Sequence, residues 1–179
     1  MTDSEEFDAF AEDLLHERFP RPLVIVGASK VDRLLVEILR TYFIPKSSKL
    51  KDADELLDGD APLATFSSRI KILRRLGLID ETLFEALEKF RTIRNLSAHS
   101  IKFDDTKSPI REHLGDLKKK ISFRHSFELT KIRYFDPVSL SKIEELQCLI
   151  LTLCVLLEAV REKTKQTRGS KATLSIAAK

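Results

Sequence analysis

Apolar residues recur every three or four positions through most of this sequence, and this spacing restricts the fold more than any other feature. Residues 23–43 show it best, with apolar side chains at Ile25, Ala28, Val31, Leu35, Ile38, Leu39 and Tyr42. Such spacing puts the side chains on one face of an α-helix. Gly and Pro, which interrupt helices, number only five and six in 179 residues. The sequence therefore predicts an all-α fold.

The same pattern predicts a bundle of about five long helices. They cover residues 3–19, 23–43, 62–76, 81–98 and 138–163, with Pro62 in the first turn of the third and Gly77 as a left-handed cap after it. Residues 46–61 form a connection whose acidic side chains serve turns and caps. A loop-rich insertion, residues 100–137, precedes the last helix. It holds a helix near 110–120 and a short extended piece at 121–129, and Asp136-Pro137 opens the last helix.

Charge is distributed unevenly along the chain. The last 19 residues hold six Lys or Arg and one Glu, a local charge of +5, whereas the whole chain carries +3, so the preceding residues sum to −2. We expect one helical domain over residues 1–163 and a flexible basic tail over 164–179. The folded body is not a basic platform for nucleic acid.

Cellular location and cofactors follow from simple patterns. The acidic N-terminus does not resemble a signal peptide, and the apolar run 146–160 is too short to span a bilayer. Cys148 and Cys154, six positions apart among apolar residues, read as small core side chains rather than a disulfide. The sequence contains no nucleotide-binding motif and no Cys/His metal pattern. We expect a cytoplasmic protein that binds no membrane, metal or cofactor.

Two features bear on nucleic-acid binding. "RRLGLIDETLFEALEKFRTIRN" resembles a helix-turn-helix, but its second helix begins with Asp80, Glu81, Glu85 and Glu88, which would repel phosphate, so direct DNA reading is not expected. Basic residues cluster at Arg69, Lys71, Arg74 and Arg75, and again at Lys118, Lys119, Lys120 and Arg124. Each cluster alone reads as a solvated face, and either becomes a phosphate track if it flanks a site.

The candidate site is Arg94, Asn95 and His99 in "KFRTIRNLSAHS". Metal-free RNA cleavage needs an acid and a base near neutral pH, which His provides, and a cation for the phosphorane charge, which Arg provides. Asn could orient a phosphate oxygen. Arg94 and His99 diverge by about 140° on an ideal helix, so the sequence predicts convergence only if the helix breaks at its end. One His per chain also requires a symmetric dimer. The structural alternative is that Arg94 binds a carboxylate or helix-end carbonyls and His99 caps the helix.

Residues 56–80, "LLDGDAPLATFSSRIKILRRLGLID", together with "FRTIRNLSAHS" and "IKFDD", resemble the mannitol operon repressor family. The resemblance covers residues 20–115 and implies an all-helical transcriptional regulator that acts with other regulatory proteins. The Arg-Asn-x-x-x-His pattern is also similar to the signature of HEPN domains, helical dimers of which many are metal-independent ribonucleases of toxin or defence systems. The sequence therefore favours a homodimeric repressor-type regulator on a HEPN-like bundle that works through protein contacts. The alternative is a dimeric endoribonuclease in which Arg94, Asn95 and His99 act on RNA.

Overall fold

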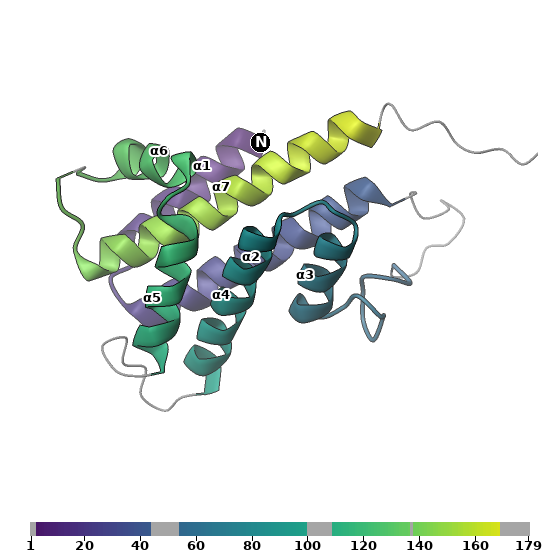
Figure 1. Ribbon diagram of the computed structural model, residues 1–179, viewed down its shortest axis with the longest axis horizontal. Helices are drawn as coiled ribbons and strands as arrows, with labels where there is room; N and C mark the ends of the chain where they lie inside the picture. The colour runs from purple at the N-terminus through teal and green to yellow at the C-terminus, as the bar shows by residue number, and fades with distance from the viewer. Residues whose placement is uncertain (1–2, 44–53, 100–108, 137, 169–179) are drawn as a thin grey trace, which may run out of the picture.

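The computed structural model describes residues 3–43, 54–99, 109–136 and 138–168, which form seven helices and no strand (Figure 1). These helices are α1 (Asp3–His16), α2 (Pro20–Tyr42), α3 (Phe66–Arg75), α4 (Glu81–His99), α5 (Ile110–Ile121), α6 (His125–Tyr134) and α7 (Lys142–Arg168). The predicted all-α class is confirmed. The count of about five long helices is too low, because the insertion before α7 itself folds into α5 and α6. None of the helices described here is long and apolar enough to cross a bilayer.

The central element of the fold is the pair α2 and α7, which run parallel to each other. Gly27 of α2 packs on Ile150 of α7, and ten residues further along α2 the Glu37 carboxylate binds Arg161 of α7 at 2.6 Å. A Cβ atom at Gly27 would lie 2.6 Å from Cγ2 of Ile150, closer than any side chain allows. The absence of a side chain at Gly27 therefore sets how near the two helices approach.

The other helices cover this pair on different sides (Figure 1). α1 and α6 pack against α7, while α3 and α4 pack against α2. α5 lies antiparallel to α4, as ion pairs from Lys89 to Asp116 and from Lys120 to Glu85 show, and it also contacts α7. The Lys89 hydrogen bond and charge hold the pKa of Asp116 below its usual range. Each of the described helices therefore packs against α2, α4 or α7.

The boundary between α1 and α2 differs from the prediction. α1 ends at His16 rather than near residue 19, and α2 starts at Pro20 rather than at residue 23. Proline fits the first turn of a helix because that position has no intrahelical use for an N–H group. The buried Gln147 amide of α7 donates to the carbonyls of Leu14, Leu15 and Glu17 at 3.0–3.1 Å. α7 thereby satisfies the carbonyls at the end of α1.

The start of α3 lies four residues later than predicted. Thr65 and Ser68 form a reciprocal capping box, in which the Thr65 hydroxyl accepts from the Ser68 N–H at 3.1 Å. Pro62 therefore stands in the preceding turn and not in the helix. The left-handed cap at Gly77 is confirmed by its φ of 68°. Turn chemistry in the acidic connection is also confirmed at Asp54, whose carboxylate accepts from the N–H groups of Leu56 and Leu57.

The insertion is where the sequence-based prediction was weakest. The helix near residues 110–120 is confirmed as α5, but the extended piece at 121–129 is wrong, since α6 begins at His125. Phe127 and Thr130 of α6 are buried, and α6 packs along α7. Contact with α7 therefore selects helix where the local pattern was ambiguous.

α7 begins at Lys142 and not at residue 138. Ser141 and Glu144 form a second capping box, in which the Ser141 N–H donates to the Glu144 carboxylate at 2.8 Å. Hydrogen bonds from Ser141 lower the pKa of Glu144. The Ser-x-x-Glu spacing is the sequence signal that would have placed this start.

α7 continues to Arg168, so residues 164–168, assigned in advance to the flexible tail, are helical. Residues 169–179 lie outside the described part. Cys148 and Cys154 are free and buried, as predicted, and burial raises the pKa of their thiols to about 11 and about 12.

Two glycine substitutions test how α2 and α7 pack. Gly27→Ala should lower the free energy of unfolding by up to about 2 kcal/mol, because an overpacking cost of about 1–3 kcal/mol exceeds the gain in helix propensity. Gly115→Ala in α5 is the matched control, since a Cβ there meets nothing within 4 Å. It should gain about 1 kcal/mol. Urea denaturation measures both, and equal gains from the two variants would contradict the packing constraint.

Candidate functional site

A groove of about 360 Å³ lies where α2, α3 and α4 meet. Its wall on α2 is a stripe of four residues at helical spacing, and Phe66 of α3 and the last turns of α4 complete it. The residues that line it are Ile25, Ala28, Ser29, Asp32, Phe66, Arg94, Ala98 and His99. Two of the three residues singled out in the sequence, Arg94 and His99, thus border one cavity.

The structure places the third residue beside the groove rather than in its lining. The Arg94 guanidinium donates to the Asn95 side-chain oxygen at 3.1 Å, so the two side chains lie together on the exposed surface of α4. α4 remains helical through His99, its last residue. The condition set for convergence of all three residues, a break at the helix end, is not met in the described part of α4: Arg94 and the exposed His99 line the groove from one continuous helix, and Asn95 lies outside its lining.

Arg21 is a neighbour of this site that the sequence did not indicate. It belongs to the first turn of α2, and its guanidinium donates to the Ala98 carbonyl at 3.5 Å. Ala98 is in the last turn of α4, where carbonyl groups lack intrahelical partners. Arg21 therefore provides the hydrogen bond to a helix-end carbonyl that the structural alternative assigned to Arg94. No periodicity or motif marks Arg21, since it lies 77 positions from Ala98.

The Asp32 carboxylate in the groove is already engaged by Arg69. The Arg69 guanidinium binds both carboxylate oxygens, at 2.9 and 2.8 Å, and donates to the carbonyls of Leu63 at 2.9 Å and Leu57 at 3.0 Å. Its side chain is only 10% exposed. This four-bond arrangement, which we call the Arg69 cluster, ties α2, α3 and the turn before α3 together. It also neutralises the one acidic side chain among the residues that line the groove.

None of the residues in the two basic clusters lines this groove. In the α3 cluster, Arg69 binds the Asp32 carboxylate. Arg74 forms an ion pair with Glu81 at 2.7 Å, and its guanidinium carbon lies 4.4 Å from the centre of the Phe84 ring. In the second cluster, Lys120 pairs with Glu85 and Arg124 with Asp80. The carboxylates of these pairs lie near the start of α4, about 14 to 21 Å along the helix axis from Arg94.

Asp80 shows how the acidic start of α4 is used. Its carboxylate accepts from the Leu83 N–H at 2.7 Å and from Arg124 at 2.7 Å. Partial burial opposes ionisation, but these hydrogen bonds and the Arg124 charge outweigh it and lower the pKa of Asp80. The carboxylates that made DNA reading by this helix implausible are therefore largely paired with α3, α5 and the residues after α5.

Chemically, the groove presents a guanidinium and an imidazole beside a wall of mixed apolar and polar side chains, with Arg21 close to the same helix end. Such a set binds an anion, and a His can also transfer a proton near neutral pH. One groove holds one imidazole. General acid and general base in a single turnover would need a second copy of the chain.

Comparison with known proteins gives matches in structure alone. No family profile and no curated protein matches the sequence. YggD from Shigella flexneri, described as a possible transcriptional regulator, superposes with a TM-score of 0.60 at 13% identity, over 88% of this chain and 95% of that chain. MtlR from Escherichia coli, solved as an MtlR–HPr complex, superposes with a TM-score of 0.56 at 20% identity, over 88% of this chain and 99% of that one.

This chain has the fold of MtlR, the mannitol operon repressor. The structural match runs beyond residues 20–115, where the sequence resembles that family, and takes in most of the chain. Within the resembling part, the stretch "LLDGDAPL" forms the turn whose Leu57 and Leu63 carbonyls bind Arg69. The stretch "LGLID" forms the turn at Gly77 and the cap at Asp80. The motifs that carry the resemblance are therefore structural turns.

The Arg69 cluster can be tested by removing its cation. Arg69→Met should cost about 2–3 kcal/mol of stability, because it leaves a half-buried carboxylate and two carbonyls without their donor. Arg40→Met is the matched control, since Arg40 binds Asp58 of the same connection at 3.1 Å on the exposed surface. Its loss should stay within about 1 kcal/mol. Chemical denaturation distinguishes them, and similar losses in both variants would be contrary to the role given to Arg69.

Proposed function

We propose that this protein is a cytoplasmic transcriptional regulator of the mannitol-repressor type that acts by binding other proteins. The observation that carries the proposal is the match to MtlR, which spans 99% of that chain, in a crystal structure where MtlR is bound to HPr. The partner proposed here is accordingly an HPr-type protein of the same host. Fold similarity is an analogy of function, so the proposal needs a direct binding test.

The α3–α4 hairpin supports a mode of action without direct base reading. A recognition helix needs free cations and polar side chains toward the DNA. Here the first half of α4 carries carboxylates that pair with Arg74, Lys120 and Arg124. Arg74, Lys120 and Arg124 thus stabilise the bundle through these ion pairs.

We place the protein-binding surface on α6 and the residue stretch before it. Of the large apolar side chains that are exposed in the described part, three gather here: Phe123, Leu129 and Ile132, which are 69%, 53% and 64% exposed. An exposed apolar group of this kind is typical of a protein interface. The other exposed large apolar residues of the described part lie outside this stretch: Phe19, Val26, Leu56 and Val138.

The binding test uses purified host HPr and the full chain in isothermal titration calorimetry. A saturable complex is expected, and the double change Leu129→Ser with Ile132→Ser should weaken it at least about tenfold, the equivalent of about 1.4 kcal/mol. Val26→Ser is the matched control for loss of one exposed apolar side chain and should leave the affinity unchanged. Lack of any complex, together with tight sequence-specific DNA binding by the chain alone, would overturn the proposal.

A second function is favoured by the geometry around Arg94. We infer from the shared groove of Arg94 and His99, with Asn95 bonded to Arg94, that a HEPN-like homodimer could bring two such sets together and cleave RNA without metal. The His of one chain would serve as base toward the 2′-hydroxyl, and the His of the other would protonate the leaving oxygen. The arginines would stabilise the charge on phosphorus.

RNA cleavage in the presence of a chelator tests this function. His99→Ala should lower the cleavage rate at least about 100-fold, a typical contribution of acid–base catalysis. His125→Ala changes another exposed His and should have no effect. If the wild-type chain cuts no RNA and His99→Ala only lowers the melting temperature, His99 caps α4 and the ribonuclease function is excluded.

A further inference from the structure

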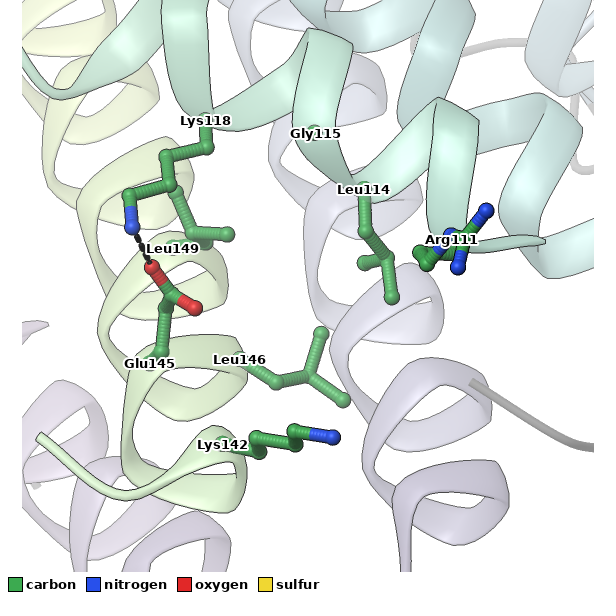
Figure 2. Close-up of a pocket in the computed structure, with 8 residues that line it drawn as sticks. All are labelled: Arg111, Leu114, Gly115, Lys118, Lys142, Glu145, Leu146 and Leu149. Carbon is green, nitrogen blue, oxygen red and sulfur yellow. Dashed lines mark ion pairs between the residues drawn. The ribbon is translucent and has the colours of Figure 1, made fainter. Parts of the chain in front are cut away.

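A second and larger groove, of about 480 Å³, lies between α5 and α7 (Figure 2). Each helix contributes a stripe at i, i+3, i+4 and i+7, beginning at Arg111 on α5 and at Lys142 on α7. None of these residues lines the Arg94 groove. The volume falls within the usual range of small-molecule sites, about 300–1,000 Å³.

The charges in this groove are unbalanced. Figure 2 shows Lys118 and Glu145 closing one side through their ion pair, so these two charges cancel. Arg111 and Lys142 are exposed, and within the described residues neither has an ion-pair partner. Two positive charges without a counter-charge at one cavity attract an anion.

The floor of the groove is apolar. Leu114 of α5 and Leu146 of α7 point into the space between the helices, and Leu149 lies deeper (Figure 2). A polyhydroxylated ligand such as a sugar phosphate would leave its hydroxyl groups against leucine without hydrogen-bond partners. A hydrocarbon or aromatic body gains from the same contact. The leucine floor thus favours the apolar part of a ligand, and the cationic rim, formed by Arg111 and Lys142, favours its anionic part.

We propose that the α5–α7 groove binds small organic carboxylates with an apolar body. The carboxylate lies between Arg111 and Lys142, and the apolar body lies on Leu114, Leu146 and Leu149. The site is independent of the proposed function, because it uses neither the α6 surface nor the Arg94 groove. A ligand here contacts both α5 and α7, and so it can influence how the insertion sits on the core.

The probe is octanoate, titrated into the full-length chain by calorimetry or by chemical-shift mapping. We expect saturable binding, with octanamide and acetate at least about tenfold weaker because each lacks one half of the recognition. Gly115→Leu adds a side chain at a residue that lines the groove, where a Cβ meets nothing within 4 Å. Octanoate binding should fall at least about tenfold in this variant.

Charge reversal tests the rim. Arg111→Glu and Lys142→Glu should each weaken octanoate binding about tenfold, whereas Lys119→Glu, the same change at a side chain 82% exposed on the same helix, should not. Equal affinity for octanoate and octanamide, or binding unchanged in Gly115→Leu and in both rim variants, would overturn the site. Absence of saturable octanoate binding across the millimolar range would do the same.

Discussion

The close approach of α2 and α7 is the constraint around which the other helices are arranged. Gly27 allows Ile150 to sit against the α2 backbone, and the two helices then run parallel as far as the ion pair of Glu37 with Arg161. Parallel neighbours cannot be joined by a short turn, so the chain between them must leave the pair and return. α3 to α6 belong to the segment that connects α2 to α7, and they cover the exposed faces of this helix pair (Figure 1).

Buried polar groups then hold the connection before α3 against α2, and the end of α1 against α7. Arg69 holds the connection before α3 onto Asp32 of α2, and Gln147 holds the end of α1 on α7. Each group donates to main-chain carbonyls at a turn or a helix end, and a buried or partly buried carbonyl is stabilised by such a donor. Both contacts join segments far apart in the sequence. They also leave the Arg94 groove with a neutralised acid, the Arg94 guanidinium and the His99 imidazole.

The long helices were predictable because their apolar spacing is strong and each is bounded by Pro, Gly or a capping residue. Helix ends were less predictable where two signals compete: Pro62 favours an early start for α3, but the Thr65–Ser68 box prevails because it satisfies two N–H groups at once. α6 was missed altogether. Its apolar pattern has no clear helical period, and only the α7 surface under Phe127 and Thr130 gives it one buried face.

The candidate site was likewise predictable from the sequence only in part. Local sequence identifies Arg94, Asn95 and His99 as a polar group at a helix end, because residue type and spacing suffice for that. The sequence also carries the turns that "LLDGDAPL" and "LGLID" form, since Gly and Asp have local backbone preferences. It could not show that Arg94 and His99 share a groove with α2, that Arg21 bonds to the end of α4, or that Arg111 and Lys142 line one groove between α5 and α7. Those relations join residues 31 to 77 positions apart and exist only once the helices have packed.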